Sequence, residues 1–269
     1  MKHLKSFILL AAIYLLIQGL GLWIAGGGLW VSGLVEQIKE NPDIGVVQNP
    51  ESPEASGQIF LYILFGTALL LLLIKLKLEI VMKVFINIAI FGGLMMTLGN
   101  LFDVPGMVAA VALFLLRLWK HENVMLMNFV LVCTVPGIGT WLGASLGLIP
   151  SLLFLIGLSV YDVVAVFGTK HMVTLAENSK SNMPLMFGIP IGERTLGLGT
   201  GDLTIPLVFT ASLLRQYPLT TSLIAAGGGL IGLTALFIYT TSRKDVILPA
   251  LPPITAGLLL GYGISLLLI

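Results

Sequence analysis

Apolar residues occur in long runs along this chain, and short polar stretches separate one run from the next. A helix needs about 20 apolar residues to cross the hydrocarbon core of a membrane. Nine runs meet this requirement, so the pattern predicts an all-α polytopic membrane protein whose residues 1–269 form a single membrane domain. The predicted spans are approximately 6–25, 57–74, 79–98, 104–119, 124–141, 149–169, 197–214, 219–240 and 246–268.

Composition supports a membrane protein over a soluble one. The chain is 57% hydrophobic and only 10% charged, whereas a soluble domain carries roughly 25% charged residues. The net charge of +1 gives no reason to expect a nucleic-acid partner. The single cysteine, Cys133, cannot form an intrachain disulfide and indicates nothing about redox compartment.

Lysine and arginine in the connections predict the orientation. Cytoplasmic loops of membrane proteins carry an excess of these residues. With the N-terminus in the cytoplasm, twelve of them lie on the cytoplasmic side and only Lys39 and Arg215 lie outside. Nine spans then place the C-terminus outside, the polar stretch 32–56 outside, and the loop 170–196 in the cytoplasm. The twelve are Lys2, Lys5, Lys75, Lys77, Lys83, Arg117, Lys120, Lys170, Lys180, Arg194, Arg243 and Lys244.

Two acids lie inside predicted spans, each next to apolar residues. Asp162 is eight residues before Lys170, and Asp202 is eight residues after Arg194, so both lie at a similar depth from the cytoplasmic side. An acid at a helix centre costs roughly 2.5–3.5 kcal/mol on insertion scales. Consecutive spans run antiparallel, so the two carboxyls can face each other. A free-energy cost of this size for each of two acids indicates that they serve a function.

Two facing carboxyls at a site shielded from bulk water can act as an acid and a base. Like charges a few ångströms apart cannot both ionise easily, so the pair holds one proton and titrates as a unit. One carboxylate can then take a proton from water while the other polarises a peptide carbonyl, without a metal or cofactor. Intramembrane acids also serve as proton relays or ion sites in transporters. A proton-coupled transporter and a scaffold that only binds remain as alternatives.

Three short motifs resemble those of a known family. Tyr161–Asp162, Gly199-Thr200-Gly201-Asp202 and Pro249-Ala250-Leu251 are similar to the YD, GxGD and PAL motifs of presenilin-type intramembrane aspartyl proteases, which signal peptide peptidases share. They occur in the sixth, seventh and ninth predicted spans, and the resemblance covers the whole nine-span layout.

The resemblance implies a GxGD-type intramembrane aspartyl endopeptidase that cuts transmembrane protein or peptide substrates in the lipid bilayer. It makes Asp162 and Asp202 the catalytic pair, flanked by Tyr161, and leaves the possibility of a homo-oligomer open. It implies that the remaining motif residues line the site or receive substrate: Gly199, Thr200, Gly201, Pro249, Ala250 and Leu251. Glycine beside Asp202 would permit close backbone approach.

The head of the last span, LPALPP, is expected to deviate from regular helix because it holds three prolines in six residues. Substrate could pair there as an extended strand. The loop 170–196 could supply another strand, but its composition does not decide this. Pro252 after the PAL motif and the cytoplasmic N-terminus favour the presenilin branch, and the short loop resembles that of microbial homologues in a cell membrane.

Other motifs have simpler interpretations. Gly143-Ala144-Ser145-Leu146-Gly147 matches the GxSxG pattern of serine hydrolases, but no predicted span contains the histidine that such a serine needs. Small residues such as Gly257-xxx-Gly261 predict close helix packing. The polar residues Gln18, Asn87 and Asn128 within spans predict hydrogen bonds between helices.

Overall fold

The computed structural model describes residues 4–27, 32–47, 49–76, 78–120, 123–168, 186–191, 194–242 and 249–268. Helices predominate in this part of the chain, together with one antiparallel pair of strands. The elements in chain order are α1 (Leu4–Gly26), α2 (Leu34–Glu40), a 3-10 turn (Pro42–Ile44), α3 (Pro53–Lys75), α4 (Glu79–Trp119), α5 (Val124–Ala144), α6 (Leu148–Val163), a π-helical turn (Val164–Gly168), β1 (Met186–Ile191), β2 (Arg194–Gly199), α8 (Thr200–Leu213), α9 (Leu219–Ser242) and α10 (Leu251–Leu268).

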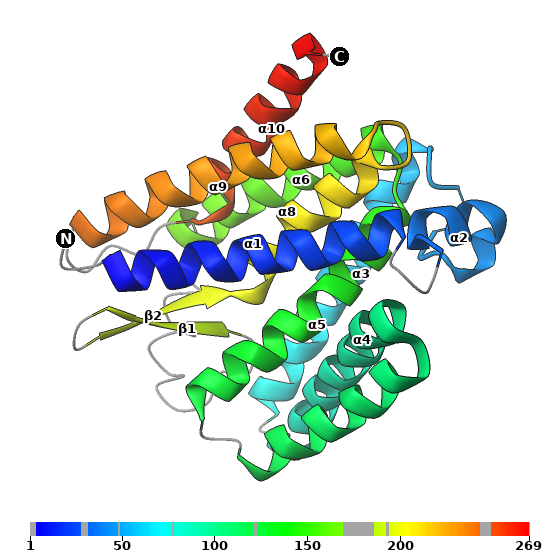
Figure 1. Cartoon of the computed structure of the whole chain (residues 1–269). Coiled ribbons are helices and arrows are strands. Elements are labelled where there is room, and N and C mark those ends of the chain that lie inside the picture. The colour runs from blue at the N-terminus through cyan, green and yellow to red at the C-terminus, as the bar shows by residue number, and fades with distance from the viewer. Residues whose placement is uncertain are drawn as a thin grey trace.

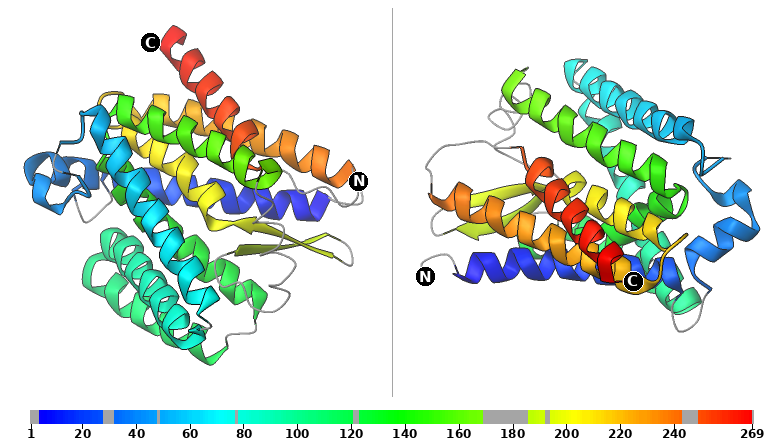
Figure 2. Two further views of the ribbon diagram at one scale, coloured as in Figure 1. Left: turned by 180° about the vertical axis from the view of Figure 1, so that it is seen from behind. Right: turned by 90° about the horizontal axis from the view of Figure 1, so that it is seen from above.

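Helix α1 lies along one face of the helical bundle (Figure 1), at its edge when the molecule is seen from above (Figure 2). It contacts α5, α8 and α9, and all three lie beside it in Figure 1. The strands lie at the end of the molecule where α1 begins, while α2 lies at the opposite end (Figures 1 and 2). Fully buried side chains from the helices and from β1 form one apolar core, which includes Tyr14, Leu131, Phe187, Phe209 and Leu258.

Helix α4 is a helical hairpin and not one straight rod. Asp103 has φ 53° and ψ −133°, a conformation that residues other than glycine seldom adopt. Arg117 donates a hydrogen bond to Asn87, 30 residues earlier in the chain, although these residues would be about 45 Å apart in a straight helix. The chain therefore reverses at Asp103, within the break that the sequence predicts between residues 98 and 104, and the predicted partner of Asn87 lies on the neighbouring segment.

Helices α9 and α10 pack backbone against backbone. A Cβ atom added to Gly228 would overlap the carbonyl oxygen of Gly257, and one added to Gly232 would overlap that of Pro253. A Cβ on Gly261 would lie 2.6 Å from the Ile224 carbonyl oxygen. Small residues at four-residue spacing let membrane helices approach this closely. The predicted packing role of Gly257 and Gly261 is confirmed.

Polar side chains join the central helices. Thr210 of α8 donates a hydrogen bond of 2.7 Å to the Gln18 side chain of α1, which confirms the predicted interhelical role of Gln18. Tyr14 donates to the Ala226 carbonyl of α9 at 2.9 Å. Because lipid offers no hydrogen-bonding partners, pairing these oxygens inside the bundle lowers the cost of burying the two side chains.

Six helices in the described part of the chain have the length and apolar composition to cross a membrane. The count of nine spans stays a prediction. Two features of the helices explain part of the difference between nine predicted spans and these six helices. α4 counts once although its chain doubles back at Asp103, and α8 has only 14 residues. The six segments are Leu4–Gly26, Ile80–Trp119, Val124–Ala144, Leu148–Phe167, Leu219–Ser242 and Leu251–Leu268.

The strands correct the predicted boundary between the cytoplasmic loop and the seventh span. Residues 186–191 and 194–199 pair as an antiparallel hairpin, with Met186 opposite Gly199 and Ile191 opposite Arg194. The seventh helix consequently begins at Thr200 and not at residue 197. Phe187 and Ile189 are fully buried while Pro190 is exposed, which is the alternation of a strand with one buried face. Loop residues 169–185 and 192–193 lie outside the described part of the chain.

The polar stretch 32–56 also contains more structure than a loop. Residues 34–40 form α2, and Pro42–Ile44 form a 3-10 turn. Leu34, Val35 and Ile38 of α2 are buried against a cluster that includes Ile24 and Ala25 of α1. This amphipathic packing explains why a short helix forms in a segment that the polar composition predicts to be a loop.

Candidate active site

Asp162 lies in the last turn of α6, where the head of α10 meets it. Its side chain is 8% exposed. The backbone N–H of Leu251 donates a hydrogen bond of 3.1 Å to its Oδ2 atom, and the Ala250 backbone N–H also interacts with the carboxyl. The YD and PAL motifs, 89 residues apart in the chain, therefore form one site.

Asp202 lies in the first turn of α8, directly after β2. Gly199 is the residue before the helix, and its backbone N–H interacts with the Asp202 carboxyl. A Cβ atom on Gly199 would lie 3.2 Å from Oδ2 of Asp202, which is a tight contact. Glycine at position 199 thus leaves room for the carboxyl. The N-terminus of a helix also favours negative charge.

The two carboxyls belong to the same site. α6 packs against both α8 and α10, and the charge of Asp162 acts on the carboxyl of Asp202. Each carboxyl accepts hydrogen bonds from backbone N–H groups, so neither depends on a mobile side chain for its orientation. Two acids held in this way, at a partly buried position, have the components for acid and base chemistry on a water molecule.

Of the other predicted site residues, those of the PAL motif lie beside Asp162, whereas Thr200 and Tyr161 make contacts elsewhere. Ala250 and Leu251 are 8% and 5% exposed and reach Asp162 through the backbone, while Pro249 precedes them outside the helix. Thr200 is the first residue of α8, and its carbonyl accepts a hydrogen bond from the Thr204 hydroxyl. Tyr161 is 42% exposed, and its ring meets that of Phe60 on α3 edge-on, at a centroid distance of 6.4 Å.

The structure bears on two further expectations about these motifs. A Cβ atom on Gly201 would meet no atom within 4 Å, so no neighbouring segment of this chain packs against this glycine, and its role in backbone approach stays a prediction. In the LPALPP segment, Pro252 and Pro253 lie inside the first turn of α10. A helix tolerates proline there because the first N–H groups have no partner within the helix. Within the LPALPP segment, Pro249 and Ala250 are the only described residues that lie outside the helix.

The hairpin was missed as a defined element, although its sequence carries a signal. In MFGIPI and RTLGLG, apolar side chains alternate with glycine or proline, as in a strand with one buried face. Asn128 of α5, predicted to join two helices, instead hydrogen-bonds the backbone of Gly188 in β1. The strand pair is the only sheet among the described residues.

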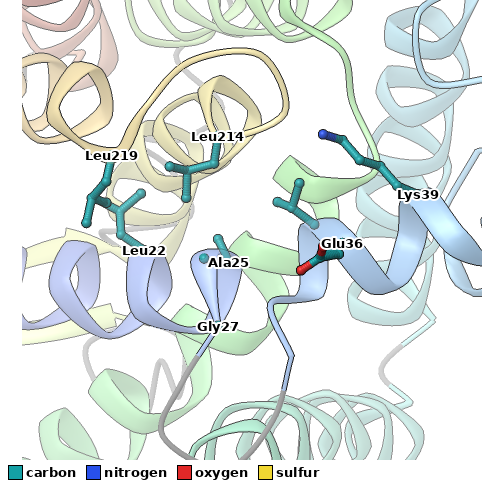
Figure 3. A pocket seen from close by; sticks show the side chains of 9 residues that line it. Leu22, Ala25, Gly27, Glu36, Lys39, Leu214 and Leu219 are labelled. Carbon is teal, nitrogen blue, oxygen red and sulfur yellow. The ribbon is translucent and has the colours of Figure 1, made fainter.

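A cavity of about 420 Å³ lies away from the two acids. Leu214 lines it at the end of α8, twelve residues from Asp202, or about 18 Å along the helix. Glu36 and Lys39 of α2 face apolar side chains across this cavity (Figure 3). None of the predicted site residues lines it. Its lining residues are Leu22, Ala25, Gly26, Gly27, Val35, Glu36, Lys39, Leu214 and Leu219.

Ser145, the serine of the GxSxG pattern, is fully buried, and its hydroxyl both donates and accepts a hydrogen bond. Its hydroxyl donates to the Trp141 carbonyl at 2.7 Å and accepts from the Val46 N–H at 2.9 Å. A Cβ on Gly143 would lie 2.5 Å from the Val208 carbonyl oxygen. The glycine and serine of this motif therefore serve packing between α5, α8 and the segment after α2.

Replacing Ser145 with alanine is expected to leave any hydrolytic activity intact and to lower stability. The change leaves the half-buried Val46 N–H without its acceptor, which costs up to about 1–3 kcal/mol. Thermal unfolding in detergent, measured beside a peptide-cleavage assay, checks both parts. Loss of cleavage in a variant that remains folded would instead identify Ser145 as a nucleophile.

Groups of three or more metal-ligating side chains (His, Cys, Asp or Glu) do not occur in the part of the chain that the structure describes. The candidate site itself offers two carboxyls and backbone N–H groups.

Comparisons with known proteins agree with the fold. The family model described as signal-peptide peptidase, presenilin aspartyl protease matches residues 33–196. This match includes Asp162 and ends before Asp202.

Local sequence similarity leads to signal peptide peptidases. The human protein is 43% identical over 65 residues, and the mouse protein is 42% identical over the same length. These matches cover 22% of this chain and only 17% of either relative.

Similarity of fold covers almost the whole chain. A presenilin family intramembrane aspartate protease, solved in a C222 crystal form, superposes with a TM-score of 0.74 at 23% identity and covers 98% of this chain and 99% of its own. A P2 crystal form gives a TM-score of 0.67 at 24% identity, with 96% of each chain covered. At these identities the superpositions establish the fold. Together with the family model, which spans more than half of the residues, they show that this chain belongs to the signal peptide peptidase and presenilin family of aspartyl proteases.

Proposed function

We propose that this chain is an intramembrane aspartyl endopeptidase that hydrolyses peptide bonds of transmembrane substrates with Asp162, Asp202 and an activated water. The observation that carries the proposal is that Asp162, in the last turn of α6, and Asp202, in the first turn of α8, lie on two helices that pack against each other, with the Leu251 N–H at the start of α10 bonded to Asp162. Membership of the family supports it.

The two carboxyls divide the chemical work. In the resting pair, one carboxyl is neutral and the other is ionised. The ionised member takes a proton from water, and the oxygen of that water attacks the peptide carbonyl while the neutral member polarises it. The tetrahedral intermediate then breaks its C–N bond as the amine leaving group receives the proton that the first carboxyl took from water. No metal or cofactor takes part in these steps.

The space around Asp202 suits an extended substrate. A side chain at Gly201 would meet nothing within 4 Å, so a peptide backbone can approach beside the acid. Strand β2 leads directly into α8, whose first turn carries Asp202. No described segment pairs with the outer edge of β2. Strand addition to such an edge is a general mode of peptide recognition. A helical substrate would unwind locally and pair there before cleavage.

Orientation in the membrane follows from the charge distribution. The strands and the start of α1 lie at one end of the molecule (Figure 1), and the lysine and arginine bias predicts that this end faces the cytoplasm. The dyad would then lie near the inner surface of a microbial cell membrane, with the C-terminus outside.

The experiment that tests the function is incubation of the purified protein with a helical membrane peptide. Mass spectrometry of the products, wild type beside Asp202→Ala, is expected to show cleavage by the wild type alone. A transporter would instead show solute flux in proteoliposomes that collapses in the same variant, with the peptide intact. A scaffold that only binds would be unchanged by the substitution.

The backbone donor of the PAL motif gives a second test. Leu251→Pro removes the N–H that bonds Asp162, at the first position of α10 where a helix accepts proline. A hydrogen bond to a charged group contributes about 1.5–3 kcal/mol, so we expect kcat to fall about tenfold or more. Leu251→Ala is the matched control because it also removes the buried side chain but keeps the N–H. Equal losses in both variants would show that the side chain matters and the donor does not.

A further inference from the structure

We propose that Asn128 is a positioning residue that fixes the strand hairpin beside the dyad and so selects the substrate bond that is cut. This inference rests on the proposed proteolytic function. Asn128 lies on α5 and is 60 residues from the strand residue that it contacts. The three motifs of the site do not include it.

The contact is a pair of hydrogen bonds to one residue. The Asn128 side-chain amide donates to the Gly188 carbonyl oxygen at 2.8 Å, and the Gly188 N–H donates to the Asn128 side-chain oxygen at 2.9 Å. A carboxamide has both a donor and an acceptor, so here it occupies the place of a neighbouring strand. It pairs with the outer edge of β1.

This pairing determines which way the hairpin backbone faces. In an antiparallel pair, opposite residues alternate between those that bond each other and those that direct their N–H and C=O groups outward. Gly188 directs its N–H and its C=O to Asn128. Gly188 and Gly197 therefore form a pair that does not exchange hydrogen bonds across the ladder. Gly197 then presents its N–H and C=O at the outer edge of β2.

A second contact agrees with this assignment. Pro190, two residues after Gly188, directs its carbonyl outward to the Ser6 hydroxyl of α1. Proline lacks an N–H and is confined to positions where the ladder does not need one. The outer edge of β1 is therefore attached to α1 and α5, which leaves the outer edge of β2 for another chain.

The same helix also holds the segment that carries Asp202. Along its length α5 packs against α8, and a Cβ on Gly139 of α5 would lie 3.3 Å from the Thr204 side chain. Asn128 thus sets the position of the hairpin relative to a helix that contacts α8. A substrate strand paired at Gly197 would be in a fixed register with Asp202, five residues later.

The test uses Asn128→Leu, which keeps the number of side-chain heavy atoms and the branch at Cγ but removes both hydrogen bonds. The probe is a synthetic peptide with one apolar transmembrane segment flanked by lysines, in detergent micelles. We expect new cleavage positions, displaced along the peptide, because a weakly specified strand slips in register. We also expect kcat/KM to fall about tenfold, as two neutral hydrogen bonds are lost.

Asn100→Leu is the matched control. The Asn100 side chain bonds only the Met96 carbonyl of its own helix among the hydrogen bonds described, so its cleavage positions should equal those of the wild type. Asn128→Ala removes the same bonds without a bulky apolar side chain and replaces Asn128→Leu if that variant fails to fold. Thermal unfolding of each variant reports its fold.

The outcomes separate the two proposals. Wild-type cleavage positions and kcat/KM in a folded Asn128 variant would overturn the positioning role while the protease remains. A wild-type protein that cuts no peptide would overturn the proposed function and this inference with it. Displaced positions in Asn128→Leu, together with an unchanged pattern in Asn100→Leu, would support both.

Discussion

Asp202→Asn is expected to abolish peptide cleavage while the helices remain folded. Asparagine keeps the size of the side chain and an oxygen that can accept the Gly199 N–H, but it cannot exchange a proton with water. General acid–base catalysis contributes about 10²–10⁴-fold in rate. A loss of about a hundredfold to ten-thousandfold should therefore appear in kcat.

Asp162→Asn should have the same effect, and the double variant should be no worse than either single one. Residues that act as a unit show this lack of additivity. Unfolding temperatures should not fall, because each change removes an acid that costs roughly 2.5–3.5 kcal/mol in a membrane. Circular dichroism and timed mass spectrometry provide the two measurements. The mechanism is wrong if either single variant cuts the peptide at the wild-type rate.

Gly228→Leu is expected to destabilise the protein by about 3 kcal/mol or more and to reduce cleavage with it. Any side chain at this position overlaps the Gly257 backbone, and overpacking of a tight contact typically costs about 1–3 kcal/mol, occasionally more. The damage should reach the active site, because α10 begins with Leu251, whose N–H bonds Asp162.

The adjacent glycine provides the control. A Cβ on Gly227 would meet no atom within 4 Å, so Gly227→Leu should unfold at or above the wild-type temperature, since leucine is the better helix former. Both variants add the same atoms to the same helix. Thermal unfolding in detergent measures the difference, and equal stability of the two would show that α9 and α10 do not depend on this close contact.

The helices and the two acids could be predicted because their signals are local. A run of about 20 apolar residues identifies a membrane helix whatever surrounds it, and the break that contains Asp103 is visible as the end of one run and the start of another. The cost of an acid among apolar residues likewise depends on its immediate neighbours. Asp162 and Asp202 are conspicuous for that reason.

The sequence signal for the hairpin is weak because its strands are short and depend on distant partners. Six residues with glycine and proline among them resemble a loop when read alone. Their strand conformation depends on burial of Phe187 and Ile189 against the helices and on Asn128 of α5. The start of α8 was misplaced for the same reason, since β2 continues to Gly199.

The chain by itself determined that this is a multi-helix membrane protein with two costly acids at similar depth, because these properties are sums over neighbouring residues. Only the tertiary structure decided that Leu251 donates to Asp162, that Tyr161 turns toward Phe60, and that open space lies beside Gly201. Directions and contacts of this kind depend on how segments far apart in the chain pack together, and no local pattern records that packing.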